Sequence, residues 1–216
     1  MTLDATWTRA WIDRTADVVA AHHTALSELD RQIGDGDHGE NLSRGFTAVR
    51  ARLADLPADA TPGAALKLVA TTLISTVGGA SGPLLGTAYL KGSAALGDAT
   101  ELDAEALVAF LTAARDGVVL RGKAEVGDKT MIDAWTPAVD AATAAAADGA
   151  SPAGVLRAAA DAAATGAAST EPLVARKGRA SYLGERAVGH RDPGAQSSSL
   201  IIAAAADAAD GSNKES

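Results

Sequence analysis

The chain has 216 residues, of which 47% are hydrophobic and only 3% aromatic, with a formal net charge of −8 and no cysteine. The acidic balance argues against a nucleic-acid partner, which needs a concentrated basic surface. The lack of cysteine excludes disulfides and thiolate chemistry. No apolar run is long enough to cross a bilayer and no signal-peptide pattern opens the chain, so we expect a cytoplasmic protein without membrane contact.

Alanine supplies much of the apolar content, which favours closely packed helices over a β-sandwich or barrel. Apolar periodicity, capping residues and glycine stops therefore predict an all-α fold. The eight predicted helices span residues 6–29, 40–53, 62–77, 84–96, 100–120, 130–147, 151–170 and 196–209. We expect one domain over residues 1–210 and a disordered polar tail over 211–216.

Start signals mark three of these helices. Thr61 and Ser151 each precede a proline, which is the pattern of an N-cap followed by proline at the first helical position. Thr100 with Asp103 resembles a capping box that opens the fifth helix.

The connections between the predicted helices alternate in character. The second, fourth and sixth are short and carry no unusual residues, whereas the first, third, fifth and seventh are rich in glycine and polar residues. Short loops favour antiparallel neighbours, which would put all four odd-numbered connections at one end of an up-and-down bundle. Four helices also begin at that end, and helix N-termini attract anions. Carboxylates at such an end predict a metal ion that bridges to a phosphate.

The first connection holds the strongest signal in the chain. Asp30, Asp35 and Asp37 fall within eight residues, where their charges repel one another unless a cation lies between them. Mg²⁺ prefers oxygen ligands, and the interleaved glycines let the backbone turn and a ligand approach. We predict a Mg²⁺ site here that holds phosphates. The alternative is that these aspartates have only a structural role, as turn and capping residues.

Three familiar motifs are excluded. Gly34, Gly36 and Gly39 spell the dinucleotide fingerprint, but no strand precedes them and two of the intervening residues are aspartates. An EF-hand would need a glycine at its sixth position and a glutamate at its twelfth, and neither is present. The P-loop pattern occurs nowhere in the chain.

The third and seventh connections each allow two interpretations. The small residues at 78–82 form either a tight turn or a floor on which a flat ring can lie. Arg176, Lys177 and Arg179 are either a solvated basic patch or the groups that neutralise a phosphate.

Taken together, these motifs resemble the family of nucleotide-binding L subunits of dihydroxyacetone kinases. The resemblance spans nearly the whole chain, in order and without large insertions. The matching segments are residues 29–31, 33–39, 77–83, 121–125, 127–131, 175–185 and 192–194.

The resemblance implies an eight-helix antiparallel barrel with ADP or ATP bound at one end. It implies that Asp30, Asp35 and Asp37 hold two Mg²⁺ ions, and that Arg179 assists phosphoryl transfer. Glu40 departs from the uncharged residue expected at its position and adds an anion beside the nucleotide. The implied nucleotide contacts are His38, Gly39, Glu40, Asn41, Ala80, Ser81, Gly122, Met131, Arg179, Asp192, Pro193 and Gly194.

The resemblance also implies a reaction route and two partners. A phosphohistidine on a phosphocarrier subunit, charged from phosphoenolpyruvate, would convert bound ADP to ATP, which then phosphorylates dihydroxyacetone on a separate K subunit. Two alternatives stay open: a freely ATP-exchanging kinase subunit for a related keto-sugar such as a tetrulose, and a non-enzymatic helical module. A homodimer is also left open by the sequence.

Overall fold

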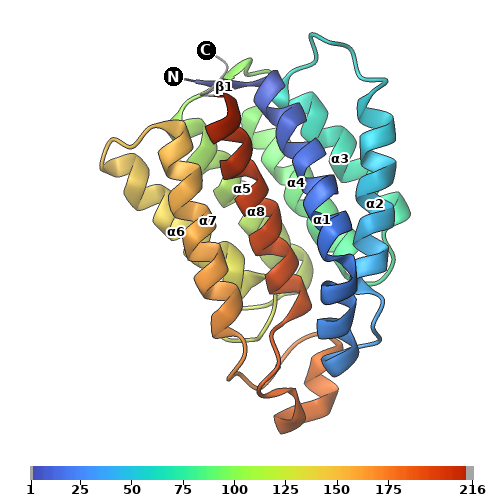
Figure 1. The fold of residues 1–216 in the computed structure, drawn as a ribbon. Coiled ribbons are helices and arrows are strands. Elements are labelled where there is room, and N and C mark those ends of the chain that lie inside the picture. The colour runs from blue at the N-terminus through green and yellow to red at the C-terminus, as the bar shows by residue number, and fades with distance from the viewer. Residues whose placement is uncertain (1, 213–216) are drawn as a thin grey trace.

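The computed structural model describes residues 2–212 as a bundle of long helices, which confirms the predicted all-α fold (Figure 1). The α-helices are α1 (Ala5–Ile33), α2 (His38–Leu53), α3 (Pro62–Thr76), α4 (Ser81–Leu96), α5 (Ala104–Gly122), α6 (Ile132–Ala147), α7 (Pro152–Ser169) and α8 (Pro193–Ser212). The other elements are the strands β1 (Leu3–Asp4) and β2 (Glu101–Leu102) and the 3₁₀ helix η1 (Arg179–Ala187). Most of the predicted tail, residues 213–216, lies outside the described residues.

Successive helices pack side by side, and α8 returns to α1, which closes the ring. Two tryptophans of α1 make this closure specific. The indole nitrogens of Trp7 and Trp11 each donate a 3.0 Å hydrogen bond to α8, to the carbonyl oxygens of Ala205 and Ile201. Their rings stack with centroids 5.4 Å apart, and the Phe110 ring meets Trp11 edge-on at 5.6 Å. Buried aromatic rings with satisfied N–H groups thus join the first helix to the last and to α5.

The helices that begin at the end bearing β1 are all capped by side chains. Asp4, Thr61, Asp103 and Ser151 each accept a backbone N–H from the first turn of α1, α3, α5 and α7 respectively. The two proline-linked caps are therefore confirmed. The predicted capping box is wrong in detail, because Asp103 is itself the N-cap. The residues just before it form β2, which pairs antiparallel with β1.

Helix bounds differ from the predicted ones mainly at the opposite end of the bundle. Helix α1 continues to Ile33, so Asp30 lies in its last turn and not in a loop. Helices α4 and α8 begin at Ser81 and Pro193, a few residues earlier than predicted. Each of these first turns contains a proline, which fits there because its missing N–H has no helical partner. The seventh connection also contains η1, which periodicity did not reveal.

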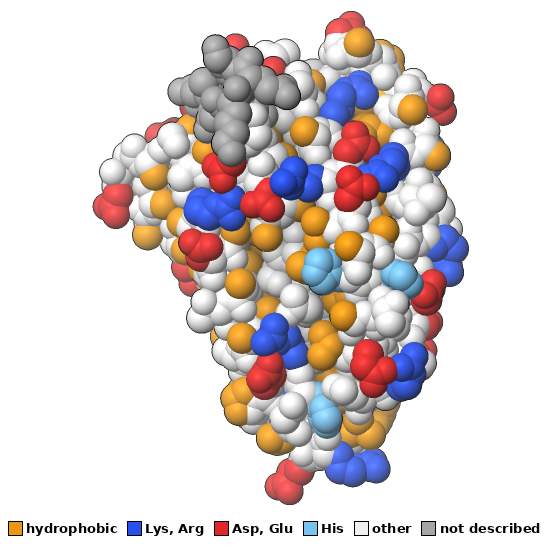
Figure 2. All heavy atoms as spheres, viewed as in Figure 1, with side chains coloured by type: hydrophobic (Ala, Val, Ile, Leu, Met, Phe, Trp, Pro, Cys, Tyr) orange, Lys and Arg blue, Asp and Glu red, His pale blue; other side chains and the backbone are white. Residues whose placement is uncertain are grey.

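The surface carries acidic and basic side chains interspersed on the face seen in Figure 2. Several pairs link neighbouring helices: Arg50 of α2 reaches Asp17 of α1 at 2.6 Å, and Arg157 of α7 reaches Asp207 of α8 at 2.8 Å. Each such exposed pair contributes little to stability by itself. Within the part of the chain that the structure describes, no helix has both the length and the apolar composition to cross a bilayer.

Candidate functional site

A cavity of about 430 Å³ lies at the end of the bundle opposite β1, which is a normal size for a small-molecule site. Its walls come from all four odd-numbered connections and the helix ends beside them, so the predicted convergence is confirmed. The predicted site residues that line it are Asp30, Asp35, Asp37, His38, Ala80, Ser81, Gly122, Met131, Arg179, Asp192, Pro193 and Gly194.

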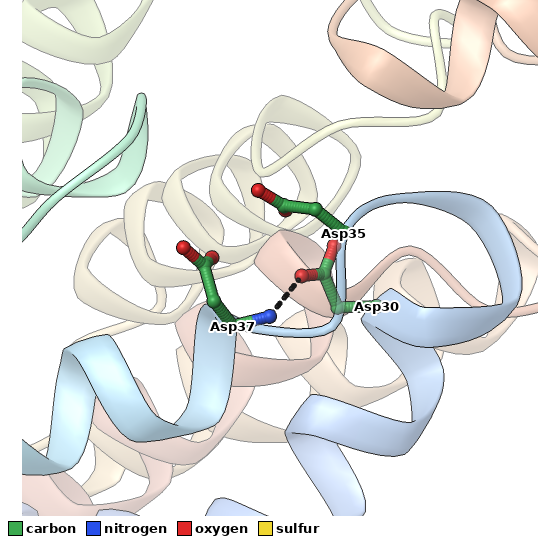
Figure 3. Close-up of side chains that lie close together, drawn as sticks. All are labelled: Asp30, Asp35 and Asp37. Atoms are coloured by element: carbon green, nitrogen blue, oxygen red, sulfur yellow. Dashed lines mark hydrogen bonds between the residues drawn. The ribbon is translucent and has the colours of Figure 1, made fainter.

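The three aspartates of the first connection meet at this cavity. Each offers a carboxylate oxygen, and the three oxygens lie within 4.8 Å of one another (Figure 3). Asp30, which is only 9% exposed, accepts the backbone N–H groups of Asp37 at 2.9 Å and His38 at 3.2 Å through Oδ2. Asp37 occupies the N-cap of α2 but makes no side-chain bond to that helix. Capping therefore accounts for Asp30 alone, and two exposed carboxylates are left facing it.

The turn that gathers these carboxylates depends on glycine. A Cβ on Gly34 would lie 2.1 Å from Oδ1 of Asp30, so any larger residue would push that carboxylate aside. Gly36 has a φ of +80°, a conformation that favours glycine. The chain can thus reverse between α1 and α2 within a few residues and keep the aspartates together.

Arg179, from the start of η1, reaches across the cavity mouth to the first connection. Its Nη1 lies 2.6 Å from Oδ2 of Asp35. Both side chains are partly exposed, so the pair is free to exchange partners when another charged group enters. A cation beside the carboxylates is also well placed to meet a phosphate.

Burial shifts the pKa values of the titratable groups deeper in the site. Desolvation raises the pKa of Asp192 to about 7 and also raises that of Asp30. Desolvation lowers the pKa of His38 to about 4, and its Nε2 lies 2.9 Å from Oγ of Ser197 on α8. The His38 ring is therefore a neutral packing group at neutral pH.

The third connection forms a floor of small residues. Gly78, Gly79, Ala80 and Ser81 all line the cavity, and a Cβ on Gly79 would meet nothing within 4 Å. The floor is therefore open above Gly79, as the interpretation in terms of a flat ring requires. Asn41 lies close to Gly78, since a Cβ there would be 3.6 Å from its side-chain amide.

The helices that begin at the cavity contrast with those that begin at the other end. The N-cap residues of α2, α4 and α6 are Asp37, Ala80 and Met131, and among the described residues none of them bonds its helix through a side chain. Only α8 has such a bond, from Ala195 N–H to Asp192 at 2.7 Å. The first N–H groups of α2 and α6 are bonded instead by side chains outside the helix, those of Asp30 and Thr130. The starts of α2, α4, α6 and α8 all line the cavity, an arrangement that suits an anionic ligand.

Three predicted nucleotide contacts lie outside the cavity lining. Gly39 is buried against α1, where a Cβ would lie 1.9 Å from the carbonyl oxygen of His23. The Glu40 carboxylate points to the same helix, 3.5 Å from Nε2 of His23, so the extra anion lies away from the cavity. Asn41 accepts a 2.6 Å hydrogen bond from Arg44 and supports the floor from below.

Other residues of the site were not predicted. Leu84, Val118 and Ile132 line the cavity, but apolar residues on helices give no sequence signal that separates them from the core. Lys129 is 1% exposed and donates to four backbone carbonyls. Neither its burial nor its acceptors follow from a periodic pattern.

Comparison with known proteins places this geometry in a family. A model described as the DAK2 domain matches residues 32–207. The chain is 45% identical over 197 residues to the ADP-binding subunit DhaL of the PEP-dependent dihydroxyacetone kinase of Escherichia coli strain K12, a match that covers 91% of this chain and 93% of that one. It is 36% identical to an L-erythrulose 1-kinase of Mycolicibacterium smegmatis, over 90% of this chain but 34% of that protein.

The fold agrees with this assignment. A crystal structure of the dihydroxyacetone kinase from C. freundii in complex with AMP-PNP and Mg²⁺ superposes with a TM-score of 0.70 and 26% identity. The match covers 96% of this chain and 34% of that one. The chain therefore belongs to the DAK2 domain family and, within it, to the ADP-binding L subunits of dihydroxyacetone kinases.

Proposed function

We propose that this chain is the subunit of a dihydroxyacetone kinase that binds ADP and ATP. It accepts a phosphoryl group from a phosphohistidine carrier that depends on phosphoenolpyruvate, and passes it to dihydroxyacetone on a K subunit. The observation that carries the proposal is the meeting of three carboxylates with the starts of four helices, α2, α4, α6 and α8, in one cavity. Carboxylates repel phosphates and amide groups attract them, so a cation must complete such a site.

The three aspartates fit a magnesium site. Asp30, Asp35 and Asp37 supply hard oxygen donors within 4.8 Å of one another, and we propose that they hold two Mg²⁺ ions. When bound, the metal neutralises phosphate charge and orients the transferred group. Asp30 is fixed by the N–H groups at the start of α2, whereas the Asp35 carboxylate is held by Arg179. Asp30 is thus a rigid metal ligand, whereas Asp35 becomes available to the metal when Arg179 turns away from it.

The nucleotide base and phosphates have separate places in the cavity. We propose that the base lies on the floor at 78–81, between small residues and the apolar side chains of Leu84 and Met131. The phosphates lie toward the aspartates, and Arg179 supplies positive charge beside them as the catalytic side chain. The remaining proposed contacts are His38, Gly122, Asp192, Pro193 and Gly194, which line the cavity, and the main-chain groups of Gly39, Glu40 and Asn41 in the first turn of α2 beside it.

In sequence the chain is more similar to a separate subunit than to the matching part of a single-chain kinase: it is 45% identical to the E. coli subunit and 36% identical to the L-erythrulose 1-kinase. The match covers 93% of the separate E. coli subunit but only 34% of the L-erythrulose 1-kinase and of the C. freundii enzyme. A kinase subunit for a tetrulose that exchanges ATP freely is the second candidate, because an erythrulose kinase is among the relatives. Extensive dialysis separates the two: retained stoichiometric ADP indicates a coenzyme, and rapid loss indicates an exchanging substrate.

Substitution of a single metal ligand tests the proposal. Asp37→Asn removes one anion that no helix uses as a cap, so we expect Mg²⁺-dependent ADP binding to disappear while helical content is unchanged. Calorimetric titration with ADP and Mg²⁺, together with circular dichroism, measures both. Asp59→Asn, at an exposed position in the connection between α2 and α3, is the matched control and should bind as the wild type does. Undiminished ADP binding by Asp37→Asn would refute the metal assignment.

A further inference from the structure

Lys129 is the most deeply buried cation of the described residues, and the proposed function gives it no role. Its side chain is 1% exposed, in the connection between α5 and α6. Nζ donates to the carbonyl oxygens of Thr170 at 2.8 Å, Glu171 at 3.3 Å, Leu173 at 3.2 Å and His190 at 2.5 Å. One ammonium group thus bonds four main-chain carbonyls that lie up to 20 residues apart in the chain.

Three of these carbonyls lie at the two ends of one segment, and the fourth, that of Thr170, lies directly before it. The segment runs from Glu171 to Asp192, between α7 and α8, and contains η1. It extends beyond the end of the bundle, beside the C-terminal end of α1, as the orange chain at the bottom of Figure 1 shows. Its first residues and its last residues both bond Lys129. The ammonium thus joins the two ends of the segment, which together form its stem.

The same segment supplies one wall of the nucleotide cavity. Lys177, Gly178, Arg179 and Ala180 all line it, and Arg179 makes the ion pair with the metal-site carboxylate of Asp35. Other contacts also tie this segment to the bundle: Arg176 N–H donates to the Asp128 carbonyl oxygen at 3.0 Å, and His190 Nδ1 lies 3.0 Å from Oε1 of Gln32 on α1. Its small apolar cluster consists of three alanines and Leu183 packed on Ile33, the last residue of α1. These hydrogen bonds lie near the two ends of the segment, and Lys129 bonds both ends, so the direction of Arg179 depends on how the stem is held.

The chain around Lys129 is built to present its amine to the stem. Its backbone has a φ of +63°, a left-handed conformation that non-glycine residues rarely adopt. The neighbouring residues contact the segment and the cavity. The carbonyl oxygen of Asp128 accepts the N–H of Arg176 in the segment at 3.0 Å, and Thr130 lines the cavity. Burial lowers the pKa of Lys129, while the carboxylates of Asp192 and Glu171 act in the opposite direction.

We propose that Lys129 is a positioning residue: its ammonium joins both ends of the segment 171–192 to the cavity wall and so aims Arg179 at the phosphate site. The inference rests on the proposed function for its consequence in nucleotide binding, but the fixing of the segment stands on the four contacts alone. Hydrogen bonds from a charged donor are about twice as strong as neutral ones, and four acceptors around one ammonium leave no free proton on it.

Removal of the amine should release the segment without unfolding the bundle. Lys129→Ala keeps the Cβ, and with it the backbone preference, but removes the charged donor that four carbonyls share. The carbonyls of Thr170 and Glu171 keep the N–H groups of Leu173 and Gly189, whereas those of Leu173 and His190 lose the ammonium that they bond. The atoms removed are those of propylammonium, so this cation should refill the space and restore the bonds. The neutral alcohol 1-propanol has the same chain length and no charge, and should not.

Hydrogen exchange measured by mass spectrometry tests the proposal directly. In Lys129→Ala, amide exchange over residues 171–192 should accelerate at least about tenfold, while exchange in the core of α1 and α8 stays unchanged. Affinity for Mg²⁺–ADP should fall about tenfold or more, because the displaced wall no longer fits the nucleotide. Propylammonium should reverse both effects and 1-propanol should reverse neither.

Lys123→Ala is the matched control. Lys123 lies in the same connection with a φ of +54°, but its side chain is exposed. This variant should match the wild type in both measurements. Exchange and affinity in Lys129→Ala that equal those of Lys123→Ala would overturn the proposal. Loss of helical signal in both Lys129→Ala and Lys129→Met would also overturn it, since Lys129 would then be required for folding.

The outcomes for Lys129 and for the proposed function are distinguishable. If the wild type fails to bind ADP with Mg²⁺, the proposed function fails, and the exchange measurement still decides whether Lys129 fixes the segment. If the wild type binds and the variants differ neither in exchange nor in affinity, only the role of Lys129 fails.

Discussion

Asp192 shows how single residues of the site are set by their surroundings. Its carboxylate is buried at the start of α8 and accepts the N–H of Ala195. The main-chain N–H of Asp192 donates to Oγ1 of Thr170 at 3.0 Å. Desolvation raises its pKa to about 7 despite these favourable contacts. A group that caps a helix and lines the cavity is therefore close to its titration point at neutral pH.

This shift has a definite sign in the stability of the protein. A carboxylate whose pKa is raised on folding contributes stability that is full below the unfolded value, near pH 4, and is lost as the pH rises through 7. Asp192→Asn keeps a capping side chain but cannot ionise. Urea unfolding at pH 5 and pH 8 should show the variant gaining about 2 kcal/mol relative to the wild type, on the scale of ~1.4 kcal/mol per pKa unit. A difference that does not change with pH would contradict the assigned burial.

At this scale the sequence predicted which residues meet but not how they bond. The spacing of Asp30, Asp35 and Asp37 was enough to predict a cluster, because a short glycine-containing turn cannot separate them far. That Asp30 holds the start of α2, and that Arg179 pairs with Asp35, depends on the end of α1 and on a contact 144 residues away in the chain. Local sequence patterns predict neither of these two contacts.

At the scale of elements, close helix packing depends on glycines at the crossings. Gly166 of α7 faces α6, where a Cβ would lie 2.1 Å from the carbonyl oxygen of Asp133. The side chain of Asp133 accepts the N–H groups of Gly127 at 2.6 Å and Thr130 at 2.7 Å, which shapes the connection beside the cavity. A change in this crossing is thus transmitted to the site.

We expect Gly166→Ala to lower the free energy of unfolding. Overpacking costs about 1–3 kcal/mol, which outweighs the gain of up to ~1 kcal/mol in helix propensity. It should also weaken binding of Mg²⁺–ADP, because α6 must move. Denaturant unfolding and calorimetry measure the two effects. Gly211→Ala in α8, where a Cβ meets nothing within 4 Å, is the control and should be neutral or slightly stabilising. Equal stabilities of the two variants would contradict the packing described.

The helices themselves could be predicted, and their starts only in part. The caps at Thr61 and Ser151 were recognisable because a capping side chain precedes a proline. The N-cap residues of α4 and α6, Ala80 and Met131, make no such bond, and there the predicted starts were two or three residues off. The weakest capping signals thus mark the functional end of the bundle.

For the whole molecule, the antiparallel order of successive helices brings alternate connections to one end. The sequence predicted that arrangement, because short connections without unusual residues alternate with connections rich in glycine and polar residues. The ring closure between α8 and α1 through Trp7 and Trp11 did not, because a tryptophan stripe is equally typical of any buried helix face. The strands β1 and β2 were also missed, since two residues are too few for an alternating pattern.

The position of the metal in a nucleotide complex tests the central claim most directly. Crystals grown with ADP and Mn²⁺, which replaces Mg²⁺ and scatters anomalously, locate the ion without reference to the protein model. We predict anomalous peaks at coordination distance from carboxylate oxygens of Asp30, Asp35 and Asp37, with the diphosphate on their far side and Arg179 turned toward it. Peaks elsewhere, or a bound nucleotide with the three carboxylates unligated, would contradict the account.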